Sequence, residues 1–165
     1  IHDVRWVLGE SVEDTFPDLR KQWLGRLRGL HIDSYKCIKY VDGYEIVISK
    51  ASKDNLVKPK SGDLKLWFVN LGGYNPKKMY EEHEFTLVVA KKAIDAKKKA
   101  RKNWESTLKQ KHNDDYSDIN NFKLVDDIHS INKIKSWKIK LISNSEQRSQ
   151  SLTPDWYGYM RIDKF

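Results

Sequence analysis

The chain has 165 residues, of which 39% are hydrophobic and 12% aromatic, and its formal net charge is +8. This share of aromatic residues excludes an intrinsically disordered chain. The sequence contains no apolar run long enough to span a membrane, and its one cysteine, Cys37, excludes an intramolecular disulfide. We therefore expect a globular protein of a reducing compartment, the cytoplasm, with Cys37 as a small buried apolar side chain.

The first part of the chain predicts a strand, a helix and a hairpin. In the segment Val4–Leu8, the apolar residues Val4, Trp6 and Leu8 would share one face of a strand. The dipeptide Asp42-Gly43 between the alternating runs Tyr35–Tyr40 and Tyr44–Ser49 predicts a β-hairpin. Between the strand and the hairpin, one helical stripe is formed by residues three or four apart: Val12, Phe16, Leu19, Trp23 and Leu27.

A second series of elements follows a stretch of linker composition at residues 51–64. The apolar strand Leu66–Gly73 ends in Gly-Gly and precedes the strand Phe85–Ala90. A closing hairpin is expected from Phe122–Asp127 and Ser136–Ile142, and in the polar tail, residues 144–165, Trp156–Ile162 could form a short strand or latch. The second helical stripe consists of Ala93, Lys97, Ala100, Trp104 and Leu108.

The two series are copies of one unit. At a shift of 81 residues, His2–Tyr35 matches His83–Tyr116 without a gap and with ten identical positions, whereas unrelated stretches of this length share about two. The repeat aligns Trp23 with Trp104, both expected in a core, and predicts that the copies superpose. We therefore expect an α+β fold of two tandem ββαββ modules of the ubiquitin-roll kind, residues 1–50 and 65–143, packed as a pseudo-dimer.

The first copy lacks a counterpart of Leu66–Gly73, so the expected strand Val4–Leu8 has no partner. An unpaired edge strand can be completed by another extended segment. Residues upstream of Ile1, the tail Trp156–Ile162 or a second chain could provide it, and we favour upstream residues. A chain beginning at Ile1 would then aggregate or form a homodimer through this edge.

Several strings in the chain resemble a bacterial family catalogued as domain of unknown function 1543. The resemblance covers most of the chain and implies a fold unit of bacterial origin, with no activity attached to it. The second copy departs from the pattern, since His83-Glu84 replaces His2-Asp3. The strings that carry the resemblance are Ile1–Val4, Leu8–Glu10, Leu19–Gly25, Gly29–Ser34, Val41–Tyr44 and Leu66–Gly73.

Two clusters of histidine and acidic residues are the candidate sites. In an extended segment, residues two apart point to the same face, so His31 and Asp33 would lie together, as would His112 and Asp114. Imidazoles and carboxylates are ligands of zinc, manganese and iron, so a divalent metal is one hypothesis. We favour the other, in which His31 and His112 make structural hydrogen bonds. The two clusters comprise His2, Asp3, His31 and Asp33, and His83, Glu84, His112 and Asp114.

No residue is assigned a catalytic or cofactor-binding role, because no nucleophile or phosphate-loop motif accompanies the clusters. We expect a non-catalytic binding or assembly module of unknown partner, and the alternative is a metal-dependent enzyme with duplicated sites. The third hypothesis is a weak nonspecific nucleic-acid binder. It is not favoured, because lysines are scattered along the chain and the densest basic run, Lys91–Lys102, would spread around a helix.

Overall fold

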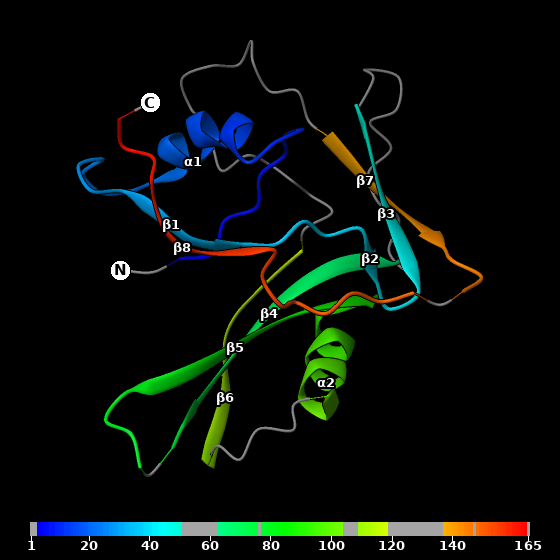
Figure 1. Cartoon of the computed structure of the whole chain (residues 1–165). Coiled ribbons are helices and arrows are strands. Elements are labelled where there is room, and N and C mark those ends of the chain that lie inside the picture. The colour runs from blue at the N-terminus through cyan, green and yellow to red at the C-terminus, as the bar shows by residue number, and fades with distance from the viewer. Residues whose placement is uncertain are drawn as a thin grey trace. The chain divides into compact units, whose positions relative to one another are not determined.

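The computed structural model (Figure 1) describes residues 3–50, 63–75, 77–103, 109–118, 137–146 and 148–164, with the backbone alone for residues 50, 74, 103 and 109–118. The fold is α+β, with small antiparallel sheets and short helices. It divides into two compact units. Unit 1 combines Ile1–Cys37 with Thr153–Phe165, and unit 2 is Ile38–Leu152. None of the helices in the described ranges is long and apolar enough to cross a membrane.

Unit 1 contains the 3-10 helix η1 (Glu13–Thr15), the helix α1 (Phe16–Gln22) and the strands β1 (His31–Tyr35) and β8 (Trp156–Arg161). Reciprocal hydrogen bonds precede η1: the Ser11 N–H donates to Asp14 Oδ2 at 2.9 Å, and the Asp14 N–H donates to Ser11 Oγ at 3.3 Å. This arrangement satisfies N–H groups that a helix start leaves without partners. It also lowers the pKa of the Asp14 carboxyl.

Strands β1 and β8 form an antiparallel two-stranded sheet that joins the two ends of the chain. Aspartates hold β8 at both ends. Before the strand, Asp155 accepts from the Cys37 N–H at 2.7 Å and pairs with Lys36; after it, Asp163 accepts from the Gly29 N–H at 2.7 Å. A two-stranded sheet is marginal on its own, so these contacts at the strand ends are part of what keeps β8 in place.

Unit 2 contains a three-stranded sheet in the order β5-β4-β6, from β4 (Lys65–Tyr74), β5 (Glu81–Ala90) and β6 (Lys109–Asp118). Helix α2 (Ala93–Asn103) packs against this sheet, as Figure 1 shows. Alanines on its inner side allow the close approach, since Ala96 and Ala100 are fully buried. The residues of this core are Trp67, Val69, Leu71, Val88, Ala90, Ala96 and Ala100.

The other sheet of unit 2 has the order β2-β3-β7, from β2 (Tyr40–Val41), β3 (Tyr44–Lys50) and β7 (Trp137–Ser143). Asp42 and Gly43 both have positive φ, 53° and 82°, as the predicted two-residue hairpin turn requires. Asp42 also accepts from the Val89 N–H at 2.6 Å and pairs with Lys99 Nζ at 2.8 Å. The turn therefore connects its own sheet to β5 and α2.

Four expectations are corrected by the structure. Val4–Leu8 is not a strand, because it has no ladder partner among the described residues; the tail strand β8 pairs with β1 instead. The first helix ends at Gln22 and not near Leu27, which is 44% exposed. Trp23 turns back from the helix and donates its indole N–H to the Arg26 carbonyl at 3.2 Å, so it is only partly buried. Cys37 is exposed and not buried, and its backbone N–H donates to Asp155 at the surface.

Several predicted strands are confirmed, and other predicted segments are not described by the structure. Strands β4 and β5 and the start of α2 agree with the sequence pattern, and β7 agrees with Ser136–Ile142. Its partner is β3, which pairs with it in register from Tyr44↔Ser143 to Lys50↔Trp137. The expected strand Phe122–Asp127, the linker and Trp104 lie outside the described residues, and the division into modules 1–50 and 65–143 stays a prediction.

Candidate ligand-binding site

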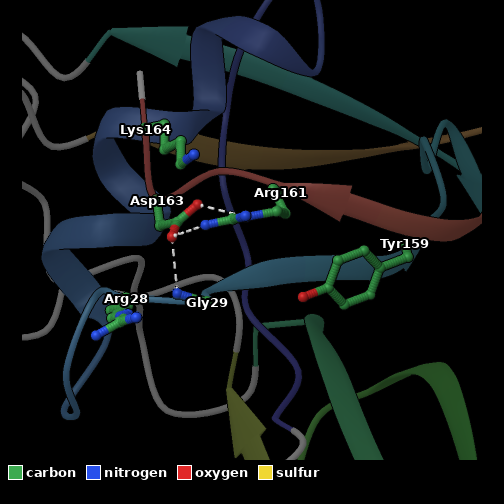
Figure 2. A pocket seen from close by; sticks show the side chains of 6 residues that line it. All are labelled: Arg28, Gly29, Tyr159, Arg161, Asp163 and Lys164. Carbon is green, nitrogen blue, oxygen red and sulfur yellow. Dashed lines mark hydrogen bonds and ion pairs between the residues drawn. The ribbon is translucent and has the colours of Figure 1, made fainter.

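An open hollow of about 630 Å³ lies in unit 1, where β1 begins and β8 ends (Figure 2). Residues from both ends of the chain meet there. The 28–31 segment enters β1, and the 159–164 segment leaves β8. Three of the lining side chains are cationic and one is aromatic: the residues are Arg28, Gly29, Tyr159, Arg161, Asp163 and Lys164.

Asp163 is the centre of the polar contacts in this hollow. Its carboxylate accepts two hydrogen bonds from Arg161, at 3.0 Å from Nε and 2.7 Å from Nη2, and one from the Gly29 N–H at 2.7 Å. These donors, Arg161 first and Gly29 second, hold the pKa of the Asp163 carboxyl well below its usual range. Figure 2 shows the carboxylate between these two partners. The negative charge of Asp163 is thus compensated within the site.

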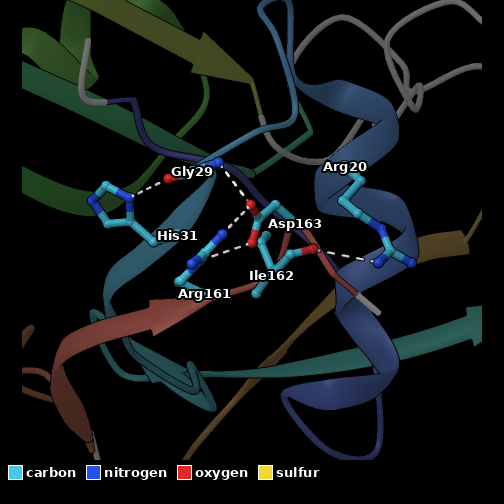
Figure 3. A network of polar contacts seen from close by, with 6 residues as sticks. All are labelled: Arg20, Gly29, His31, Arg161, Ile162 and Asp163. Atoms are coloured by element: carbon cyan, nitrogen blue, oxygen red, sulfur yellow. Dashed lines mark hydrogen bonds and ion pairs between the residues drawn. The ribbon is translucent and has the colours of Figure 1, made fainter.

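Further contacts fix the segments around Asp163, as Figure 3 shows. Arg20 from α1 donates to the Ile162 carbonyl at 3.3 Å, and the Ile162 N–H donates to the Leu30 carbonyl at 2.9 Å. The Ile162 side chain is almost completely buried, at 1% exposed. The backbone on which Arg161 and Asp163 stand is therefore anchored by packing as well as by hydrogen bonds.

His31 supports the aromatic wall of the hollow. Its ring lies 4.2 Å from the ring of Tyr159, centroid to centroid, at an angle of 35°. His31 Nδ1 is 2.8 Å from the Gly29 carbonyl, and Nε2 is 3.2 Å from Asp33 Oδ1. A neutral imidazole can donate to one of these oxygens and an imidazolium to both. Tyr159 itself is 63% exposed, so its ring is both supported and accessible.

Two cationic side chains of the hollow have no side-chain partner among the described residues. Neither Arg28 nor Lys164 has an ion pair or hydrogen bond from its side chain to the residues described here. Arg161, in contrast, is held by Asp163. The hollow therefore holds two positive charges without side-chain partners and an exposed aromatic ring, which suits an anionic ligand with a planar apolar part.

The predicted clusters can now be placed. In the first, His31 and Asp33 are together, and Asp3 pairs with Arg5; His2 is outside the described residues. His31 thus contacts a backbone carbonyl and an acid, the partners that the hydrogen-bond hypothesis named, and its structural role stays a prediction. No group of three or more potential metal ligands is present among the residues whose side chains are described.

In the second cluster, His83 and His112 lie at the same level of the sheet, on either side of Gly72 of β4. His83 Nδ1 is 3.1 Å from Asn70 Oδ1, and its Nε2 is 3.8 Å from Glu81 Oε2. Glu84, one position further along β5, is exposed. The side chains of His112 and Asp114 are outside the description, so the metal hypothesis stays a prediction for this copy.

The strand pairing is irregular at the His-x-Asp segment of both copies, in a different way in each. In the first copy Asp33 lies opposite two residues of β8, Gly158 and Tyr159, so the extra residue is in β8. Pairing of β6 with β4 skips Asp114, since Asn113 and Asp115 face consecutive residues of β4. Such bulges redirect side chains and are common beside functional sites.

The features above define a small α+β protein with a cationic hollow in unit 1. Its family follows from comparison: the chain belongs to the family described as Domain of Unknown Function (DUF1543), whose model matches residues 1–48 and 78–127. A crystal structure of the protein Il1583 from Idiomarina loihiensis is similar, with a TM-score of 0.67, 28% sequence identity, and coverage of 98% of this chain and 85% of that one. No curated protein matches the chain significantly.

Sequence reasoning missed this hollow. Arg28 and Lys164 are separated by most of the chain, and only the pairing of β8 with β1 brings their segments together. One sequence signal was available, since residues alternate in the tail so that Tyr159 and Arg161 fall opposite Met160 and Ile162. That pattern indicates an exposed aromatic and cationic face, but it does not reveal the partner strand.

Proposed function

We propose that this protein is a non-catalytic binding module that takes an anionic ligand in the hollow of unit 1. The observation that carries the proposal is that Arg28 and Lys164, two cations without side-chain partners among the described residues, line the same hollow as the exposed ring of Tyr159. A catalytic role is less well supported, because the acid of the hollow, Asp163, is fully engaged by Arg161 and Gly29. A base must be free to take a proton.

The proposed architecture is two tandem ββαββ modules packed as a pseudo-dimer, in the bacterial cytoplasm. One observation supports the duplication: the family model matches the chain in two segments. In this arrangement β8 stands beside β1 as β4 stands beside β6. The tail strand thus serves the first copy in place of a Gly-Gly strand.

Titration with inorganic tripolyphosphate tests the binding function. We expect calorimetry to detect binding by the whole chain, and the double variant Arg28→Ala/Lys164→Ala to weaken it roughly thirtyfold or more, since each lost charge–charge hydrogen bond is worth about 1 kcal/mol or more. The matched control is Lys98→Ala/Lys102→Ala, which removes two exposed lysines from α2. Equal weakening by both double variants, or no binding at all, would overturn the proposal.

The second candidate function, a metal-dependent enzyme, is favoured by one observation: His83 and His112 flank Gly72, a residue without a side chain, at the same level of the sheet. Imidazole is a ligand of zinc and manganese, so two histidines paired with the same glycine in the backbone register are a reasonable start of a metal site. Elemental analysis of the purified protein tests it. Metal at one equivalent that is lost in His83→Ala would support the enzyme, and metal-free protein after incubation with zinc and manganese would reject it.

A further inference from the structure

We infer that the ligand of the hollow is a segment of single-stranded nucleic acid, with one base stacked on Tyr159 and the flanking phosphates bound by Arg28 and Lys164. This inference rests on the proposed binding function and assigns its ligand class.

The first step is the state of the Tyr159 ring. An exposed aromatic side chain normally loses conformational freedom when a ligand stacks on it. Here His31 already contacts the ring at a centroid distance of 4.2 Å, and His31 is itself held by Gly29 and Asp33. The ring is therefore oriented before binding, while 63% of Tyr159 is still open to solvent. A supported, accessible ring is a stacking platform.

The second step is the charge around that ring. Arg161 and Asp163 compensate each other, so the net charge of the lining side chains comes from Arg28 and Lys164. Phosphates are the anions that repeat along a chain with planar bases between them, and the protein as a whole carries a net charge of +8. A positive groove with an aromatic platform is the arrangement that binds single strands without strong sequence preference.

The third step excludes a duplex. In a double helix the bases are stacked on each other and their faces are closed to a tyrosine. The exposed ring of Tyr159 can therefore stack only on a base of an unpaired, flexible strand. The hollow of about 630 Å³ has the volume of a site for one nucleotide unit.

This assignment reverses the order of the hypotheses drawn from the sequence. Nucleic acid was not favoured, because lysines are scattered along the chain and the densest basic run would spread around a helix. The pairing of β1 with β8 places Arg28 and Lys164 on one hollow with Tyr159, whose ring is in contact with His31.

The experiment uses the whole chain and a fluorescein-labelled oligonucleotide of twelve thymidines, with binding followed by anisotropy in low salt. We expect Tyr159→Ala to weaken binding roughly 5- to 100-fold, as loss of one stacked base does, and Tyr159→Phe to bind as the unchanged protein does. The matched control is Tyr80→Ala in unit 2, because Tyr80 is exposed to the same extent, 62% against 63%. Circular dichroism and thermal melting of each variant show that it is folded.

The outcomes separate the ligand class from the binding function. If Tyr159→Ala binds the oligonucleotide as tightly as the control while tripolyphosphate still binds through Arg28 and Lys164, the inference fails and the binding function stands. Equal affinity for thymidine triphosphate and the oligonucleotide would assign the site to a free nucleotide and overturn the single strand. If neither the oligonucleotide nor tripolyphosphate binds, both proposals fail.

Discussion

Asp42 should be the most informative single position for the stability of unit 2, because its backbone and its side chain contribute separately. Its φ is 53°, a conformation that costs alanine about 1 kcal/mol more than glycine. Its carboxylate, 18% exposed, accepts from the Val89 N–H and pairs with Lys99. A charge-assisted hydrogen bond contributes about 1.5–3 kcal/mol, and a part-exposed ion pair about 0.2–1 kcal/mol.

Three substitutions separate these contributions. Asp42→Asn keeps an acceptor and tolerates positive φ, so we expect a loss of about 1 kcal/mol from the missing charge. Asp42→Gly keeps the turn and loses the side chain, for about 2–3 kcal/mol. Asp42→Ala adds the backbone cost of about 1 kcal/mol. Urea unfolding followed by tryptophan fluorescence measures the free energy of unfolding, and hydrogen exchange measures protection of the Val89 amide.

We expect the loss in the free energy of unfolding to increase in the order Asp42→Asn, Asp42→Gly, Asp42→Ala. Equal losses for Asp42→Gly and Asp42→Ala would show that the turn does not require positive φ. A Val89 amide that stays protected in Asp42→Gly would show that the carboxylate is not its acceptor, and the account of how the hairpin is tied to β5 would be wrong.

Three other predictions concern unit 1 and the helix. Asp163→Asn should lower the melting temperature at neutral pH. Because the pKa of Asp163 is depressed in the folded protein, its carboxylate stabilises the fold above the unfolded pKa of about 3.9, and this stabilisation is lost as the pH falls further. The melting temperatures of the variant and of the unchanged protein should therefore converge in acid. Persistence of the full difference at pH 2 would contradict this. Asp155→Ala should release the start of β8 at a cost of about 1–2 kcal/mol, seen as faster hydrogen exchange there but not in unit 2. Ala96→Leu should cost about 1–3 kcal/mol by overpacking between α2 and the sheet, whereas Lys98→Leu on the exposed side should be near neutral.

The sequence predicted elements well where local patterns and local pairing agree. Strands β4 and β5 are neighbours in sequence as well as in space, and the Asp42-Gly43 turn determines its own hairpin. The sequence did not predict strand pairing correctly where the partner strand comes from a distant segment of the chain. Val4–Leu8 has a strand pattern and no ladder, because alternation of apolar residues cannot form a strand without a partner for the backbone.

The site illustrates the same limit. The histidine and aspartate of the first cluster were identified from the repeat, and the structure places His31 beside Asp33. Their relation to Tyr159 depends on β8 pairing with β1, across almost the whole chain. A periodicity of two in the tail indicated an exposed face, but which strand receives that tail is a property of the three-dimensional fold.

Residue-resolved mapping by NMR is the most direct test of the claim that the binding surface lies in unit 1. The isotope-labelled chain is titrated with the oligonucleotide of twelve thymidines, and amide shifts are followed in both units. We predict that the largest shifts fall on residues 28–35 and 156–164, including Tyr159 and Lys164. Shifts confined to the basic run Lys91–Lys102 would place binding on α2 and contradict the account.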